Sequence, residues 1–156
     1  MGVIEPGPSA FEGFSRQVAG DEPIVLINLL RYRPRADGPG QLTGRQAYQR
    51  YATAIAPMLM AVGARPIWRA NGRFVLIGPA GEHWDEIILV AYPSRAAFDR
   101  LLNLPGFQAR AGLRAAALQD SRLIAASAPQ SISRLTWLLY TLATRLRSRR
   151  PPPPDA

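Results

Sequence analysis

Two segments of the chain are apolar on both of the sides that a β-strand would present. Residues 23–33 read PIVLINLLRYR, and residues 85–93 read DEIILVAYP. Successive side chains of a strand point to opposite faces of a sheet, so both faces would carry large apolar groups. We expect helices of the same chain to cover one face and a second copy of the chain to cover the other, because a bare apolar row marks an interface.

Three segments carry apolar residues at steps of three and four, the period of an amphipathic helix. The first helix is expected to begin with a capping box at Ser9 and Glu12 and to end at Gly20. The second begins with a capping box at Thr43 and Gln46 and ends at Gly63. The third is capped by Ser94 and continues from Pro105 to about Leu118. Pro57 lies inside the second helix and predicts a kink there, because proline removes one backbone hydrogen bond.

Residues 65–78, RPIWRANGRFVLIG, are β-like on both sides of Asn71-Gly72. This dipeptide predicts either a two-residue hairpin or a bulge within one long strand. A last strand is expected at residues 121–126, SRLIAA. With the bulge, the order of elements is β-α-β-β-α-β, which is the split βαβ pattern of a ferredoxin-like α+β fold.

Composition narrows the chemistry that the chain can perform. Its 156 residues include no cysteine and a single histidine, His83, which excludes disulfides, thiolate nucleophiles and metal centres with several Cys or His ligands. All 19 basic residues are arginine, so no lysine Schiff base can form. We therefore expect no metal site and no cofactor.

Charge divides the chain into a nearly ordinary body and a basic tail. Residues 1–128 hold 14 arginines and 10 acids, whereas residues 129–156 hold five arginines and one acid, and SAPQS at 127–131 has the composition of a linker. The predicted parts are an N-terminal extension with a short helix (1–22), a folded domain (23–128), a basic amphipathic helix (129–150) and a Pro-rich end without fixed structure (151–156).

The predicted C-terminal helix combines an apolar stripe with a basic end. It could lie on an anionic membrane surface through residues 132–150, or it could pack on the body or on a twin chain. Its arginines offer no base readout, so we expect no specific nucleic-acid partner. The N-terminus has no signal-peptide pattern, and no apolar run is long enough to span a bilayer, so we expect a cytoplasmic protein, peripheral to the inner face of the membrane if the tail binds there.

Five stretches of the sequence occur in an order that is similar to one family. They are VLINLLRYRP, LTGRQAYQRYATAIAPMLMAVGARPIWR, FVLIGP, HWDEIILVAYPSRAAF and RAAALQDSRLIA, all within residues 23–126. Together they resemble the family called domain of unknown function 1330, of the dimeric α/β-barrel superfamily. The resemblance implies a ferredoxin-like protomer whose sheet pairs with that of its twin to form a barrel, and it favours the bulge at Asn71-Gly72.

The chain departs from that family at residues 104–108. Members often carry an Asp-Pro-Glu-Tyr-Gln-like run there, whereas this chain has LPGFQ, with no acid and with Phe107 in place of the tyrosine. The superfamily includes cofactor-free monooxygenases, haem-dependent enzymes, isomerases and proteins that only bind a ligand, so the resemblance leaves the activity open.

Candidate ligand-binding residues are polar or aromatic side chains on the predicted strands, the second helix and the segment before residue 85: Asn28, Tyr48, Tyr51, Trp68, Arg69 and Trp84. Asn28 is an amide within an apolar strand, so it is either satisfied by its neighbours or directed into a cavity. Tyr48 and Tyr51 share the inner face of the second helix and could supply phenols to the same cavity, or simply pack in the core.

Three further residues are candidates for catalysis. His83 could act as a general base, with Asp85 two positions away, or as a lone axial haem ligand, although polar loops of this kind are usually just solvated. Arg114 shares a helical face with apolar residues, where it either forms an internal pair or binds a carboxylate or enolate oxygen of a substrate.

Two functions from different classes remain open. One is a cofactor-free small-molecule enzyme that performs proton transfer or oxygenation at a carbonyl compound, with the homodimer as its active form. The other is a non-catalytic small-molecule-binding or scaffold dimer, held at a membrane surface by the C-terminal helix. The superfamily favours the enzyme, by analogy only.

Overall fold

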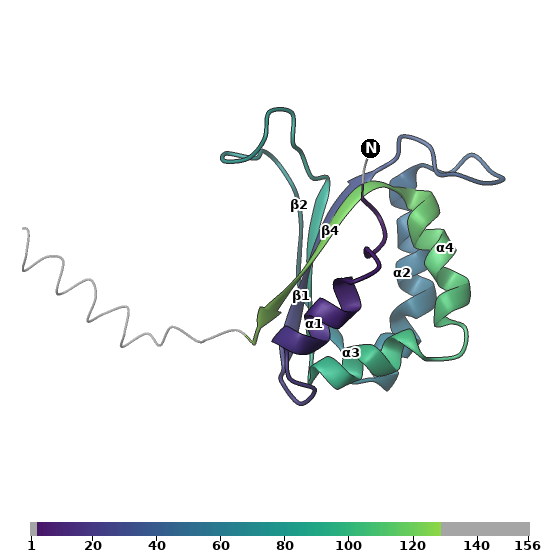
Figure 1. Cartoon of the computed structure of the whole chain (residues 1–156). Helices are drawn as coiled ribbons and strands as arrows, with labels where there is room; N and C mark the ends of the chain where they lie inside the picture. Colours follow the sequence, from purple (N-terminus) through teal and green to yellow (C-terminus); the bar gives the residue numbers. More distant parts are fainter. Residues whose placement is uncertain (1–2, 129–156) are drawn as a thin grey trace, which may run out of the picture.

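The computed structural model describes residues 3–128 of the chain (Figure 1). The predicted basic helix at 129–150 and the Pro-rich end at 151–156 lie outside the described residues. Within the described part, none of the helices is both long enough and apolar enough to cross a membrane.

Strands and helices follow one another in the expected ferredoxin-like order. The elements are α1 (Ala10–Gln17), β1 (Ile24–Tyr32), α2 (Gly44–Ala61), β2 (Arg65–Asn71), β3 (Glu86–Tyr92), α3 (Arg95–Leu102), α4 (Phe107–Ala117) and β4 (Leu118–Ser127). The strands form one sheet in the order β2-β3-β1-β4, and each neighbouring pair is antiparallel. The predicted α+β, ferredoxin-like fold is confirmed.

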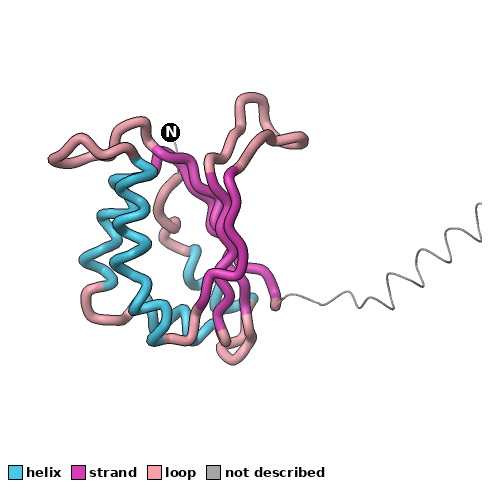
Figure 2. The backbone as a smooth tube through the Cα atoms, turned by 180° about the vertical axis from the view of Figure 1, so that it is seen from behind, coloured by secondary structure: helices cyan, strands magenta, loops and turns pink. Residues whose placement is uncertain are grey.

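All the described helices lie on one side of this sheet, as the front and back views both show (Figures 1 and 2). We call this side the covered face and the other side the open face. Along β1, the alternate residues Ile24, Leu26 and Leu30 face the helices and are almost fully buried. The residues between them, Ile27 and Leu29, point to the open face and are half-buried. A double-sided apolar strand therefore has a helix layer on one side only.

Two of the three predicted helix starts are capped as expected. The Thr43 side chain accepts a hydrogen bond from the Gln46 amide, and the Gln46 side chain accepts one from the Thr43 amide, which completes the capping box of α2. The hydroxyl of Ser94 caps α3 by accepting from the amide of Ala97. Helix α1 forms after Ser9, but the Ser9 side chain makes no capping hydrogen bond.

The third predicted helix is divided into two. Helix α3 ends at Leu102, and α4 begins after Gly106, whose φ of 81° is a left-handed conformation that favours glycine. Helix α4 is followed without a loop by β4, which begins at Leu118 and so is longer than the strand that the sequence predicts at 121–126. Pro57 lies within α2, which continues past it to Ala61.

Both interpretations of Asn71-Gly72 are wrong for the described chain. Strand β2 ends at Asn71, and residues 72–85 form a loop rather than a second strand. The sheet does contain a bulge on this strand, but it lies between Pro66 and Trp68, where the pairing of β2 with β3 shifts. The β-like residues 73–78 therefore have no strand partner within residues 3–128.

Candidate functional site

The most unusual feature of the covered face is a buried carboxylate. Glu86, the first residue of β3, is only 2% exposed. Its Oε2 accepts a hydrogen bond from the Tyr32 hydroxyl, and its Oε1 accepts one from Nε of Arg69. Nη1 of Arg45 lies 3.5 Å from Oε2. We call these four residues the Glu86 cluster. Because an isolated buried charge is costly, this carboxylate depends on its partners.

The partners keep Glu86 ionised. Burial alone would raise its pKa, but the hydrogen bonds from Arg69 and Tyr32, together with the charges of Arg69 and Arg45, outweigh burial and hold the pKa below its ordinary value. The same contacts act on Tyr32, whose pKa is raised by burial and by its hydrogen bond to Glu86. The cluster therefore contains a carboxylate anion and a neutral phenol at neutral pH.

Two further phenols lie beside the cluster, on the inner face of α2. Tyr48 and Tyr51 are each 6% exposed, and their ring centroids are 5.5 Å apart, with Tyr32 a further 5.6 Å from Tyr48. Burial raises the pKa of both tyrosines, and the charge of Arg114 partly opposes it. Both phenols are therefore neutral hydrogen-bond donors at neutral pH.

The hydroxyls of Tyr48 and Tyr51 form no hydrogen bond within residues 3–128. Among these residues, the fully enclosed side-chain atoms that lack a partner are all arginine nitrogens, Nε of Arg31, Arg33 and Arg95. The two phenol oxygens are therefore not sealed in the core. Each phenol oxygen keeps some surface that water can reach.

Arg114 approaches the phenols from α4. Its guanidinium donates to the carbonyl oxygen of Ile4 at 2.8 Å and to the hydroxyl of Ser121 at 3.1 Å, so it has no carboxylate partner in the described chain. An unneutralised cation beside two neutral donors favours an anionic ligand oxygen at this place.

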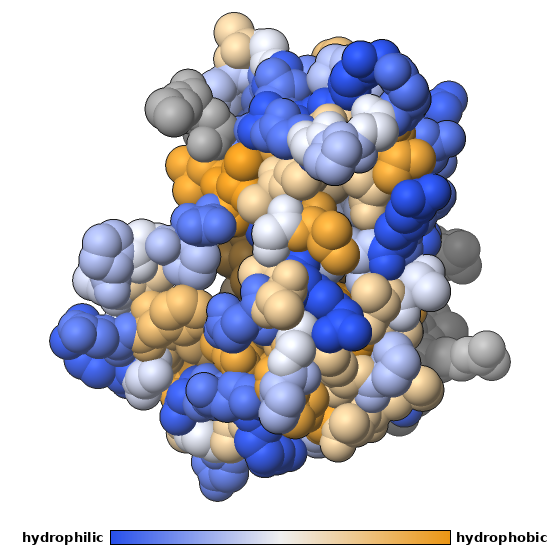
Figure 3. All heavy atoms as spheres, turned by 90° about the vertical axis from the view of Figure 1, so that its right-hand side faces the viewer, coloured by the Kyte–Doolittle hydropathy of each residue, from blue (hydrophilic) through white to orange (hydrophobic). Residues whose placement is uncertain are grey.

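Asn28 lies on the covered face, on the same side of β1 as Leu26 and Leu30. Its amide nitrogen donates two long hydrogen bonds to backbone carbonyls, at 3.4 Å to Leu26 and 3.3 Å to Ile88. Leu123, its neighbour on β4, is half exposed although it lies on the covered face. The helix layer thus covers this end of β4 incompletely, and Figure 3 shows a recess with hydrophobic walls on the helix side of the molecule.

The remaining predicted residues lie elsewhere. His83 is exposed on the loop at 72–85, with only a 3.4 Å contact to the Gly81 carbonyl. Asp85 does not pair with it and instead accepts from the amide of Tyr32 at 2.7 Å. Trp84 packs under Arg122, whose guanidinium carbon is 5.2 Å from the ring centroid, and Trp68 is half exposed on the open face. The structure therefore brings together Tyr48, Tyr51, Arg69 and Arg114. It places four other predicted residues, His83, Trp84, Asp85 and Trp68, away from them.

The sequence interpretation missed Glu86, Tyr32 and Arg45. The sequence did contain a signal for two of them. Tyr32 is the last residue of one apolar strand and Glu86 is the first residue of another, and both lie on the face that the helices cover. An acid at such a place needs a partner, and a neighbouring tyrosine or arginine is the usual one.

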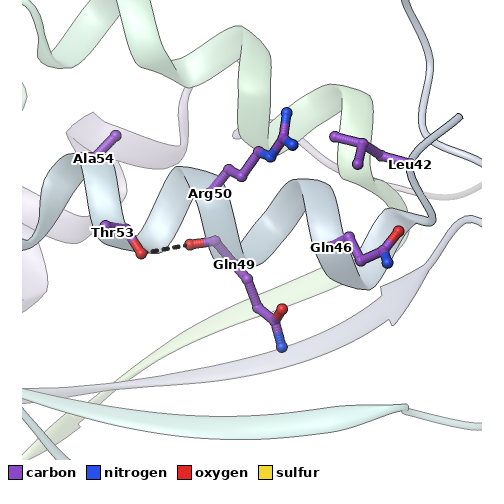
Figure 4. A pocket seen from close by; sticks show the side chains of 6 residues that line it. All are labelled: Leu42, Gln46, Gln49, Arg50, Thr53 and Ala54. Atoms are coloured by element: carbon purple, nitrogen blue, oxygen red, sulfur yellow. Dashed lines mark hydrogen bonds between the residues drawn. The ribbon is translucent and has the colours of Figure 1, made fainter. Parts of the chain in front are cut away.

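Surface hollows lie on the opposite side of α2. The larger is a groove of about 480 Å³ lined by Leu42, Gln46, Gln49, Arg50, Thr53 and Ala54 (Figure 4). Its one internal hydrogen bond, from the Thr53 hydroxyl to the Gln49 carbonyl at 3.0 Å, is local to the helix. No group of three or more metal-ligating side chains occurs among residues 3–128.

The element order and the sheet order define the chain as an α+β protein of the ferredoxin-like type. The chain belongs to the family described as domain of unknown function (DUF1330), whose profile matches residues 40–127, more than half of the sequence. A protein of unknown function from Rhodopseudomonas palustris is 35% identical, with a TM-score of 0.76 over 84% of this chain and all of that one. No curated protein matches significantly.

Weaker similarities extend to other solved structures. A dimeric ferredoxin-like protein of unknown function from Bacteroides fragilis is 14% identical, with a TM-score of 0.46, over 71% of this chain and 99% of that one. A cofactor-independent oxygenase from Streptomyces nogalater is also 14% identical, with a TM-score of 0.46, over 72% and 99%. Similarities at this level do not assign an activity.

Proposed function

We propose that the protein is a homodimer that binds a small organic molecule through an anionic oxygen, in the space beside Tyr48 and Tyr51. The observation that carries this proposal is the pair of phenols without a partner among residues 3–128. Buried polar groups are normally hydrogen-bonded, so a ligand oxygen or an ordered water has to accept these bonds. Arg114 adds a positive charge beside them, which favours a carboxylate, enolate or phenolate over a neutral acceptor.

The second function, a cofactor-free enzyme, would use the same groups. Two neutral donors beside a carbonyl oxygen stabilise the negative charge that develops there during proton transfer or oxygenation at the neighbouring carbon. Such an enzyme also needs a proton acceptor. Glu86 is a weak one, because Arg69 and Tyr32 occupy its oxygens and hold its pKa low. His83 is on an exposed loop. Binding without catalysis is therefore the better supported of the two.

The homodimer is supported by the open face. The strand register places four large apolar side chains side by side in one row across the sheet: Trp68, Leu89, Ile27 and Ile124. Trp68 and Ile124 are 50% and 49% exposed, and no helix of the described chain covers this face. A second copy of the same sheet is the simplest cover, because a two-fold contact matches the row against itself.

The binding proposal is tested by removing the two hydroxyls. Native mass spectrometry of the purified protein first shows whether a molecule is retained, and calorimetric titration then uses benzoate and 4-nitrophenolate as probes. The double variant Tyr48→Phe/Tyr51→Phe should weaken probe binding by about a hundredfold or more, because it removes two hydrogen bonds to a charged oxygen, each of which contributes about 1.5–3 kcal/mol.

The matched control is Thr53→Val, which removes a hydroxyl from the opposite side of the same helix. It should leave the affinity unchanged. Equal binding by the phenylalanine variant and the wild type would contradict the proposed site, and so would a wild-type protein that retains no molecule and binds neither probe.

The dimer is tested by light scattering. The wild-type protein should have twice the 17.1 kDa mass of one chain, and Ile27→Asp, in the middle of the row, should give a folded monomer. A wild-type protein that remains monomeric at micromolar concentration would rule out the dimer without affecting the binding test.

A further inference from the structure

The loop between β2 and β3 presents apolar side chains to water in a way that the isolated chain does not explain. Phe74, Leu76 and Ile77 are 84%, 86% and 92% exposed, more than any other large apolar residue described. We call residues 73–84 the arm. Scattered exposed apolar residues are ordinary, but three within four positions form a continuous patch, and such patches mark interaction sites.

The neck of the arm is held closed. The amide of Gly72 donates to the carbonyl of Asp85 at 3.1 Å, and a side chain at position 72 would collide with the Trp84 carbonyl, 1.9 Å from its Cβ. The amide of Asp85 in turn donates to the carbonyl of Leu30 in β1 at 2.8 Å. The arm therefore begins and ends at fixed points of the sheet, and its apolar tip extends from them.

The direction of the arm matches the open face. In both the front and the back view, the loop projects beyond the end of the sheet and leans to the side opposite the helices (Figures 1 and 2). That is the side on which Trp68 and Ile124 are half exposed. A second molecule stacked on the open face would meet the arm at its edge.

From these observations we infer that the arm packs against a second copy of this chain and is an integral part of the dimer contact, with Phe74, Leu76 and Ile77 buried on the partner. This inference rests on the homodimer proposed above. Residues 73–78 have the β-like sequence of a strand but no strand partner within residues 3–128, and a second copy would supply the neighbour that this segment lacks there.

The area of contact favours a second copy over an unrelated partner. Three large apolar side chains contribute roughly 450 Å² of exposed surface, on the scale of 150–250 Å² for an aromatic residue. A stable dimer needs about 800 Å² on each protomer. The arm alone falls short of this area. The row on the same side of the sheet adds the half-exposed Trp68 and Ile124, so one partner that covers both the arm and the row comes much closer to this area than a partner for either alone.

The test is sedimentation equilibrium of the variant Phe74→Ser/Leu76→Ser/Ile77→Ser. Its positions are so exposed that the protomer should fold normally, while the dimer dissociation constant should increase about a hundredfold or more, because burial of large apolar side chains is lost twice in each dimer. The matched control is Met60→Ser/Leu113→Ser, which removes exposed apolar residues from α2 and α4, and it should leave the constant unchanged.

Hydrogen exchange of the wild-type protein gives an independent readout. Amides of residues 73–84 should be protected at concentrations where the protein is dimeric and lose that protection on dilution. A dimer whose constant is the same with and without the three apolar residues, and whose arm exchanges freely, overturns the inference but leaves the open-face dimer standing. A wild-type protein that is monomeric throughout overturns both, and the binding test at Tyr48 and Tyr51 still stands alone.

Discussion

The two faces of the sheet differ in what covers their apolar side chains. The covered face packs Ile24, Leu26 and Leu30 against the helices and also holds the buried Glu86, whereas the open face leaves a row of large apolar side chains without a helix layer. Burying charge and exposing apolar surface both cost free energy. The charge of Glu86 is compensated by Arg69, Arg45 and Tyr32 of the same chain. The apolar row has no such cover within residues 3–128, which is the basis of the proposed dimer.

Neighbouring positions of β3 allow the sharpest test of this difference. Ile88 points to the covered face and is 9% exposed, and Leu89, the next residue, points to the open face. Ile88→Asp should cost at least about 4 kcal/mol and prevent folding, because it buries an unpaired carboxylate. Leu89→Asp should give a folded protein that is monomeric.

The measurements are circular dichroism for folding and light scattering for mass. If Leu89→Asp also unfolded the chain, the open face would have to be covered from within the chain, and the comparison of the two faces would fail.

Most of the fold could be predicted from the sequence, because it depends on short-range patterns. Thr43 and Gln46 define the start of α2, and the apolar run at residues 23–33, apolar on both sides, defines β1. The arm was predicted wrongly for a physical reason. The segment FVLIG has the composition of a strand, but a strand also needs an edge to pair with, and within the described chain no edge reaches it.

The candidate site was predicted only in part. Tyr48, Tyr51 and Arg114 could be recognised by their positions on apolar helical faces, because the helix period is a local property. Glu86 could not be given a partner in the same way. Its contacts with Tyr32 and Arg69 connect three strands, and strand order and register are long-range properties that a single sequence does not specify.

The second largest effect is expected at the Glu86 cluster. Glu86→Ala leaves the buried Tyr32 hydroxyl without its acceptor, whereas Arg69 and Arg45 are about half exposed and can be solvated. It should therefore lower the free energy of unfolding by about 1–3 kcal/mol in urea denaturation. The control is Asp37→Ala, which breaks an exposed pair with Arg33 and should cost less than about 1 kcal/mol. Equal costs for the two variants would mean that the buried charge is no more important than a surface one.

A smaller effect should appear as a pH dependence. The pKa of Glu86 in the folded protein is below its ordinary value of 4.5, so its ionised form stabilises the fold fully above that pH and loses the contribution as the pH falls through the folded pKa. The difference in unfolding free energy between wild type and Glu86→Gln should therefore be constant from about pH 6 to 8 and shrink below 4.5. If this difference in unfolding free energy instead increased below pH 4.5, the pKa of Glu86 would be raised by folding rather than lowered.

The smallest effect on the dimer is expected from removal of the C-terminal residues 129–156. These residues follow β4, an edge strand that ends at Ser127, so the amphipathic segment predicted there would compete with a second copy for covering the open face. If a second copy covers that face, the truncated protein should keep a dimer constant within about tenfold of the wild type, since the row and the arm both remain.

The same truncation tests the predicted membrane tail. Binding to vesicles that contain phosphatidylserine should be present in the full chain, decrease with salt and disappear with the tail, because basic residues near an anionic surface contribute about 1 kcal/mol each. Neutral vesicles are the control. If the truncated chain instead became a stronger dimer, the tail would have been covering the apolar row. The open face would then be covered by its own chain, and the difference between the two faces would hold only for residues 3–128.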